Sequence, residues 1–188
     1  YGNAQTTPIT SLEDNSVLVR HSPDGGPYGV YRMNPENGSF KEIFRHEYVD
    51  AGVEADDEGT PFGIYTTPGR IEFTALDENH PWSRAVQALQ RVFADGSVRV
   101  TSSTEDNRLM VVHLRQDTKT PEYFLFDTQK NNLNSLFDSR PWVDDSKLAS
   151  MEPIKLTARD GLELHGYLTL PVASNGKNEP LIIVPHGG

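Results

Sequence analysis

Short stretches rich in β-branched and aromatic residues, some with apolar and polar positions alternating as in half-buried strands, recur along most of this 188-residue chain. They predict strands within residues 16–22, 28–33, 39–44, 71–76, 97–102, 108–115, 122–127 and 133–138. Turn residues separate these stretches. Asn37-Gly38 is expected to supply the positive φ angles of a tight hairpin turn, and Asp95-Gly96 precedes another strand. We therefore expect a mainly β fold.

One segment departs from the strand pattern. Its apolar residues recur at helical spacing, at Trp82, Val86, Leu89 and Phe93. Pro81 suits the first position of a helix, and Asn79 is a suitable cap nearby. These residues predict one amphipathic helix over residues 81–93, inserted among strands, with its apolar stripe in the core.

The sequence also contains an internal repeat. The stretch DNSVLVRH at residues 14–21 resembles DNRLMVVH at residues 106–113, and an aromatic strand, a turn and a strand ending in Phe follow each copy. The copies lie about 92 positions apart, which fits β-propeller blades of about 40–50 residues each. The spacing favours a partial propeller of about three blades, in which an irregular blade carries the helix. Two similar hairpins in an all-β sandwich are the alternative.

The composition changes after residue 138. Residues 139–153 contain few strand formers and two prolines, which indicates a boundary. Beyond it, IKLTA and LELHGYLTLP predict a hairpin that turns at Asp160-Gly161, and LIIV at 181–184 predicts a strand covered on both faces. We expect residues 1–150 to form the C-terminal part of a propeller and residues 151–188 to begin an α/β domain.

Composition and charge narrow the function. The formal net charge of −10 would repel phosphate backbones, so nucleic acid is not an expected partner. The absence of cysteine excludes disulfides, thiolate catalysis and sulfur-ligated zinc. It leaves the compartment open, and both cytoplasm and periplasm are compatible. No apolar run approaches the length of a membrane span.

The familiar catalytic motifs are missing from the sequence. There is no G-x-S-x-G elbow, no H-E-x-x-H and no P-loop. The six histidines are scattered and are expected to be surface or locally bonded residues. The acidic run at 54–59 lacks the alternating oxygen ligands of a calcium loop, so we interpret it as a solvated loop. We expect no metal and no cofactor.

One motif does suggest chemistry. His186, Gly187 and Gly188 directly follow the apolar stretch LIIV. Backbone N–H groups of a glycine-rich loop can approach an oxyanion closely because no Cβ stands in the way. In α/β-hydrolases, a loop of the HGGG type early in the domain supplies one such donor. These three residues are the candidate oxyanion-loop residues.

The stretch IKLTARDGLELHGYLTLP, together with PLIIVPHGG, resembles the entry into the hydrolase domain of the prolyl oligopeptidase family of serine peptidases. The similarity is closest to its acylaminoacyl-peptidase and dipeptidyl-aminopeptidase-like branch, and LFDSRPWVD at 136–144 also resembles that branch. The resemblance implies a propeller that caps an α/β-hydrolase domain, with a Ser-Asp-His triad that cleaves short peptides. It implies that the triad lies downstream of the matched residues, so no catalytic residue is assigned in this chain.

These observations predict a fragment of a serine peptidase that acts on peptide substrates as part of a longer protein and is inactive alone. Exposed blade edges would favour self-association. The alternative is an autonomous β-rich binding or interaction module. The missing nucleophile argues against a complete small hydrolase of another kind.

Overall fold

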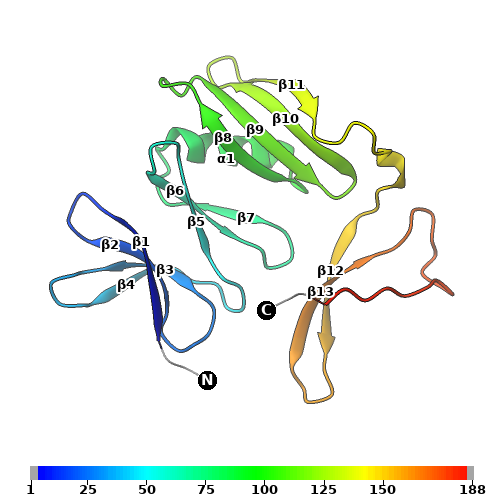
Figure 1. Ribbon diagram of the computed structural model, residues 1–188, viewed down its shortest axis with the longest axis horizontal. Helices are drawn as coiled ribbons and strands as arrows, with labels where there is room; N and C mark the ends of the chain where they lie inside the picture. The colour runs from blue at the N-terminus through cyan, green and yellow to red at the C-terminus, as the bar shows by residue number, and fades with distance from the viewer. Residues whose placement is uncertain (1–3, 186–188) are drawn as a thin grey trace.

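The computed structural model describes residues 4–185. Within that range the chain forms three antiparallel sheets and a separate two-stranded hairpin (Figure 1). The expectation of a mainly β fold is confirmed.

The elements follow the chain in simple order. The first sheet has the order β1-β2-β3-β4, with β1 (Gln5–Ser11), β2 (Val17–Ser22), β3 (Gly29–Met33) and β4 (Phe40–Phe44). The middle sheet contains β5 (Gly52–Ala55), β6 (Pro61–Thr66) and β7 (Glu72–Ala75), followed by helix α1 (Pro81–Val92). The third sheet has the order β11-β10-β9-β8, with β8 (Ser97–Ser103), β9 (Leu109–Gln116), β10 (Lys119–Asp127) and β11 (Asn132–Asp138). A 3-10 turn, η1 (Asp145–Lys147), leads to the hairpin of β12 (Met151–Thr157) and β13 (Glu163–Thr169).

The first and third sheets share the turn that the internal repeat encodes. Asn15 and Asn107 both adopt left-handed backbone conformations, with φ of 62° and 53°. In each copy the preceding aspartate accepts a backbone N–H hydrogen bond, from residue 16 to Asp14 and from residue 108 to Asp106. The repeat therefore fixes the start of the second strand in two four-stranded meanders. Three sheets arranged side by side, with the helix in the middle unit, are consistent with a partial propeller rather than a two-layer sandwich (Figure 1).

Helix α1 agrees with the predicted range to within one residue at its C-terminal end. The predicted cap was wrong, because His80 rather than Asn79 caps the helix, accepting a hydrogen bond from the Trp82 N–H at 3.2 Å through Nδ1. The Asn79 side chain instead accepts from the Arg84 guanidinium at 2.9 Å. In the part of the chain that the structure describes, no helix is long and apolar enough to cross a membrane.

The β3–β4 connection differs from the tight turn expected at Asn37-Gly38. Gly38 has a positive φ of 68°, whereas Asn37 is not among the positive-φ residues. The Gly38 N–H donates to Asn34 O at 2.8 Å, and the Asn34 N–H donates to Ser39 O at 2.9 Å. These bonds close a longer loop that needs only one left-handed residue. The β12–β13 turn follows the prediction, with Gly161 at φ 87°.

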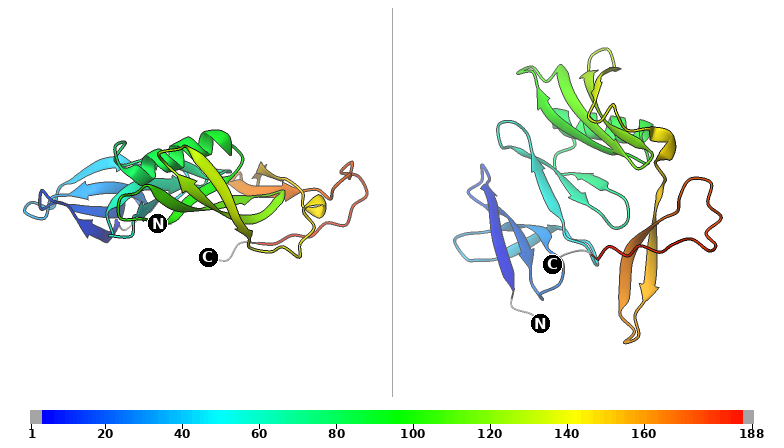
Figure 2. Two further views of the ribbon diagram at one scale, coloured as in Figure 1. Left: turned by 90° about the horizontal axis from the view of Figure 1, so that it is seen from above. Right: turned by 45° about the vertical axis from the view of Figure 1, so that its right-hand side comes forward.

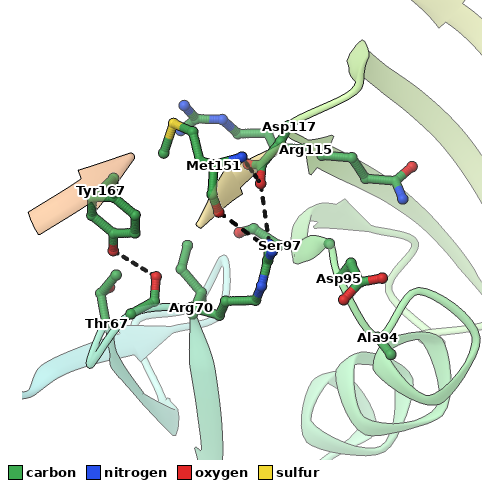
Figure 3. A pocket seen from close by; sticks show the side chains of 13 residues that line it. Thr67, Arg70, Ala94, Asp95, Ser97, Arg115, Asp117, Met151 and Tyr167 are labelled. Atoms are coloured by element: carbon green, nitrogen blue, oxygen red, sulfur yellow. Dashed lines mark hydrogen bonds and ion pairs between the residues drawn. The ribbon is translucent and has the colours of Figure 1, made fainter. Parts of the chain in front are cut away.

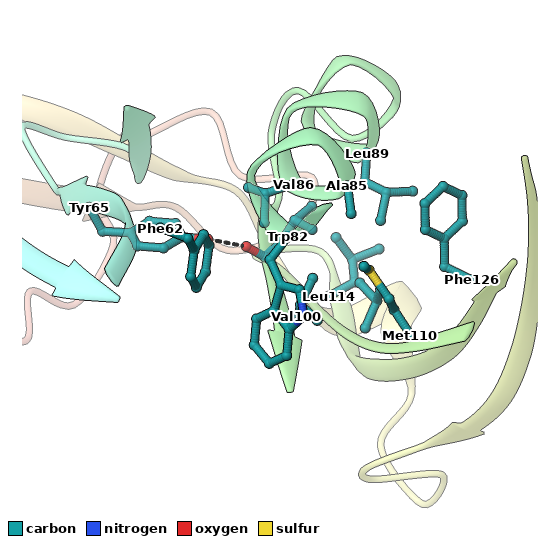
Figure 4. Close-up of a cluster of buried hydrophobic side chains, with 12 residues drawn as sticks. Phe62, Tyr65, Trp82, Ala85, Val86, Leu89, Val100, Met110, Leu114 and Phe126 are labelled. Atoms are coloured by element: carbon teal, nitrogen blue, oxygen red, sulfur yellow. Dashed lines mark hydrogen bonds between the residues drawn. The ribbon is translucent and has the colours of Figure 1, made fainter. Parts of the chain in front are cut away.

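The main core lies between the middle and third sheets and is covered by the helix (Figure 4). Its members come from β6, α1, β8, β9 and β10, and include Phe62, Tyr65, Trp82, Val86, Leu89, Met110 and Phe126. The predicted apolar stripe of the helix is therefore buried as expected. Hydrogen bonds from the Tyr65 hydroxyl to Val98 O at 2.9 Å, and from Ser83 Oγ to Phe62 O at 2.8 Å, satisfy polar groups inside this core.

Strand β6 also contributes to a second core. Ile64, which is 1% exposed, packs with Leu18, Val30 and Ala51 against the first sheet. β6 thus joins the two flanking sheets. Gly63 lies between its two core-forming neighbours, and a Cβ at this position would stand 2.0 Å from the Phe73 ring.

Replacing Gly63 with alanine is expected to lower the free energy of unfolding by about 1–3 kcal/mol, because the Phe73 ring would have to leave its packed position. Gly52→Ala is the matched control in the same sheet, since its nearest neighbour would be Tyr65 O at 3.8 Å. Urea unfolding checks both variants. Equal stability of the two would contradict the packing described for β6.

Candidate functional site

The candidate oxyanion-loop residues, His186, Gly187 and Gly188, lie outside the described residues. Their role stays a prediction. What the structure describes is the segment that leads to them and the cavity nearest the hairpin.

The segment before the motif does not form the strand that its apolar sequence predicted. Residues 181–184 have no regular secondary structure and are exposed at 77%, 83%, 77% and 85%. Strand formation requires a neighbouring strand to bond the backbone N–H and C=O groups. The hairpin sheet contains β12 and β13 alone, and neither pairs with this segment. Apolar composition on both faces indicated burial, but no layer within the described residues provides it.

A cavity of about 370 Å³ lies where the middle sheet, the third sheet and the hairpin meet (Figure 3). Its wall combines the β6–β7 loop, the residues that open β8, the β9–β10 turn, Met151 of β12 and Tyr167 of β13. An adjoining cavity of about 480 Å³ shares Arg70, Asp95 and Asp117 and extends to Glu152. Segments far apart in the sequence thus line these adjoining cavities.

Charged and polar contacts organise this cavity. Arg70 Nη1 lies 3.1 Å from Asp117 Oδ2, which also accepts the backbone N–H of Met151 at 3.1 Å. Arg70 Nη2 donates to Met151 O at 3.4 Å, so the three residues form a closed set of contacts (Figure 3). The Tyr167 hydroxyl donates to Gly69 O at 2.6 Å. The hairpin is therefore bonded to the loops that line the cavity.

The cavity does not contain the groups needed for acyl transfer. Ser97 lines it, but no histidine does so among the described residues. The histidine of the hairpin, His165, stacks instead on Tyr48, with ring centroids 4.1 Å apart and an interplanar angle of 8°. Without a base beside the hydroxyl, a serine is not an activated nucleophile. Within the described residues, Ser97 therefore has no histidine partner in this cavity.

The described histidines have local structural partners, as expected. His21 bonds Thr6 and stacks on Phe40, and His113 stacks on Tyr123. Burial lowers the pKa of His113 below its ordinary value, with the positive charges of Arg115 and Arg99 adding to the effect. Among residues 4–185, no group of three or more His, Cys, Asp or Glu side chains is arranged to hold a metal ion.

The acidic run at 54–59 also has a structural role in its loop. Asp56 Oδ1 accepts the N–H groups of Glu58 at 3.0 Å and Thr60 at 2.9 Å, while Oδ2 lies 3.1 Å from His80 Nε2. Asp56 thereby ties this loop to the helix cap.

The hydrogen bond between Lys155 and Glu163 on the hairpin raises the pKa of Lys155 and lowers that of Glu163.

No family model matches the chain. Among curated proteins it is similar to dipeptidyl aminopeptidase BIII of Pseudoxanthomonas mexicana, with 29% identity over 192 residues. The alignment covers 95% of this chain and 27% of the relative, so the chain spans about a quarter of that relative's length. This match supports the resemblance to the prolyl oligopeptidase family that the sequence shows.

Two solved structures of puromycin hydrolase are also similar, one of them a mutant complexed with PGG. Each shows 16% identity, and each alignment covers 87% of this chain and 25% of the other. The TM-scores are 0.43 for the mutant and 0.47 for the other structure.

Sequence reasoning did not identify the residues that fasten the hairpin beside the cavity. Tyr48, Arg70 and Asp117 belong to no motif, and their hairpin partners lie 34 to 117 positions away, for example Met151 for Asp117 and His165 for Tyr48. Only a three-dimensional arrangement brings them together. A Pro-Gly pair at 68–69 was the available sign of a turn there.

The exposed segment yields a simple prediction. The double variant Leu181→Ser and Ile183→Ser is expected to change the free energy of unfolding by less than about 0.5 kcal/mol, because both side chains are exposed. Ile64→Ala is the contrasting control and should cost about 2–5 kcal/mol at its buried site. A large loss of stability in the double variant, measured by urea unfolding, would show that this segment packs against the sheets.

Proposed function

We propose that this chain is the part of a serine peptidase of the prolyl oligopeptidase family that joins the end of a β-propeller to the start of an α/β-hydrolase domain. The match to a dipeptidyl aminopeptidase over 95% of the chain is the observation that carries the proposal. The three sheets support the propeller portion, and the hairpin followed by PLIIVPHGG supports the hydrolase portion.

The activity proposed for the whole protein is removal of short N-terminal units from peptides, as the name of the relative indicates for that protein. Residues 186–188 would contribute backbone N–H groups to the oxyanion hole. The resemblance implies that the Ser-Asp-His triad lies downstream of the matched residues, and the 188 residues contain no G-x-S-x-G elbow. This chain would contribute the propeller wall and the entry strands rather than the chemical step.

Inactivity of the isolated chain is the first test. The purified 188-residue protein is expected to show no hydrolysis of aminoacyl, dipeptidyl or acylaminoacyl chromogenic substrates, because it lacks a nucleophile elbow. It should also resist labelling by a fluorophosphonate probe, with an active serine peptidase as the positive control. Covalent labelling of a serine in this chain would contradict the proposal.

The encoding reading frame offers a second, independent check of the same proposal. It is expected to continue into a G-x-S-x-G elbow, and the longer protein should lose activity when that serine is replaced by alanine. A reading frame without such an elbow would favour the autonomous binding module instead.

The isolated chain is also proposed to self-associate through an edge strand. β11 pairs with β10 on one side, and no other strand among residues 4–185 pairs with its outer edge. Leu136 and Phe137 on this strand are exposed at 46% and 57%. Open backbone groups beside apolar side chains favour strand addition by a second copy.

Light scattering tests this association across a concentration series. The unmodified chain is expected to form dimers or larger species, and Phe137→Lys should shift it toward the monomer, because a charged edge opposes strand pairing. Phe40→Lys on β4 is the comparison variant at another exposed edge position. A monomer at every concentration would contradict the proposed association.

A further inference from the structure

The β12–β13 hairpin is joined to the three sheets without sharing their hydrophobic cores. The buried residues of the two core clusters lie between Leu18 and Phe126, and the partly buried residues packed against them extend only to Leu133. Among the described residues, none of these comes from the hairpin. Ile154 and Gly166 are half-buried, whereas the other residues of both strands are exposed. Figures 1 and 2 show the hairpin to one side of the sheets. Its position therefore depends on a small set of surface contacts.

The aromatic part of this contact set centres on Tyr48. The ring of Tyr48 stacks on His165 of β13, and the Lys155 ammonium of β12 lies 5.4 Å from its centroid. The Tyr48 hydroxyl donates to Pro68 O at 2.9 Å, which ties it to the β6–β7 loop. One side chain thus contacts both strands of the hairpin and the neighbouring loop.

The ionic part of the contact set involves Arg70 of the same β6–β7 loop. Arg70 and Asp117 pair with each other and with the backbone of Met151, the first residue of β12. The Tyr167 hydroxyl bonds Gly69 O, and a Cβ on Gly69 would stand 3.1 Å from the Pro153 side chain. The loop and the hairpin are thus in close contact at this point.

The same contacts shape the cavity of about 370 Å³. Met151 and Tyr167 form its hairpin wall. Arg70 and Asp117, from the loops of the middle and third sheets, bond the Met151 backbone at its edge (Figure 3). If the hairpin separates from the loops, this wall is lost. Docking of the hairpin and closure of the cavity are therefore one event.

We propose that the β12–β13 hairpin is a separable unit that docks on the sheets through a latch formed by Tyr48 and the Arg70–Asp117 pair, and that docking closes the cavity between them. Segments held by few buried apolar contacts open with lower free energy than a core. An isolated two-stranded hairpin is only marginally stable in water, so undocking should also weaken the β12–β13 pairing. This inference concerns contacts within the described chain and does not depend on the proposed peptidase function.

Hydrogen–deuterium exchange of residues 151–169, followed by mass spectrometry on the complete 188-residue chain, tests the latch. Tyr48→Ala and Asp117→Asn are expected to speed exchange of the hairpin amides by roughly 3- to 10-fold, since each removes a stacking or charge-assisted contact. The milder Tyr167→Phe, which deletes only the hydroxyl bonded to Gly69 O, should give a smaller increase in the same direction.

A matched control and a core readout make the test specific. Arg32→Gln breaks a surface ion pair with Asp14 on the first sheet, at 2.7 Å, and should leave hairpin exchange unchanged. In a Trp142→Phe background, fluorescence of the buried Trp82 reports unfolding of the main core, and its midpoint should stay constant in the latch variants. Unchanged hairpin exchange in Tyr48→Ala, Asp117→Asn and Tyr167→Phe would overturn the proposal. A core midpoint that falls together with hairpin protection would overturn it too, because the hairpin would then belong to the cooperative unit of the sheets.

Discussion

Burial of strand β6 between two sheets is the constraint on which the rest of this structure depends. Its side chains reach both hydrophobic cores, with Phe62 and Tyr65 on one side and Ile64 on the other. The first and third sheets therefore take their positions from a single strand. Gly63 makes this possible, because its missing side chain admits the Phe73 ring from β7. Helix α1 then covers the larger core, and the Ser83 hydroxyl satisfies the Phe62 carbonyl there.

The hairpin is held in place by a different kind of interaction. It is fixed by stacking, one ion pair and backbone hydrogen bonds from exposed loops rather than by shared apolar burial. Exposed ion pairs and single hydrogen bonds contribute little individually to stability. A unit attached in this way can respond to small changes at its contacts, whereas the sheets cannot move without opening a core. The cavity lies at the boundary between these two kinds of attachment.

The proposed function depends on two observations of different kinds. The PHGG motif and the hairpin before it suggested the family from local sequence, and the similarity to a dipeptidyl aminopeptidase supports it over nearly the whole chain. The cavity beside the hairpin is lined by Ser97 and, among the described residues, by no histidine.

The sequence by itself determined the elements whose signals are local. Stretches rich in β-branched and aromatic residues between turn signals located β2, β3, β9 and β10, helical spacing located α1, and the Asp-Asn repeat indicated two equivalent sheets. It did not reveal β1, β5 or β6. β6 is buried on both faces, so its sequence does not alternate between apolar and polar residues. Its Pro61 and Gly63 are residues that usually interrupt strands. At LIIV the sequence predicted a strand that the structure does not form, because an apolar run becomes a strand only where a neighbouring strand pairs with it. Only the tertiary structure decided where β6 lies and how Tyr48, Arg70 and Asp117 meet the hairpin, because these contacts join distant segments whose pairing no local pattern records.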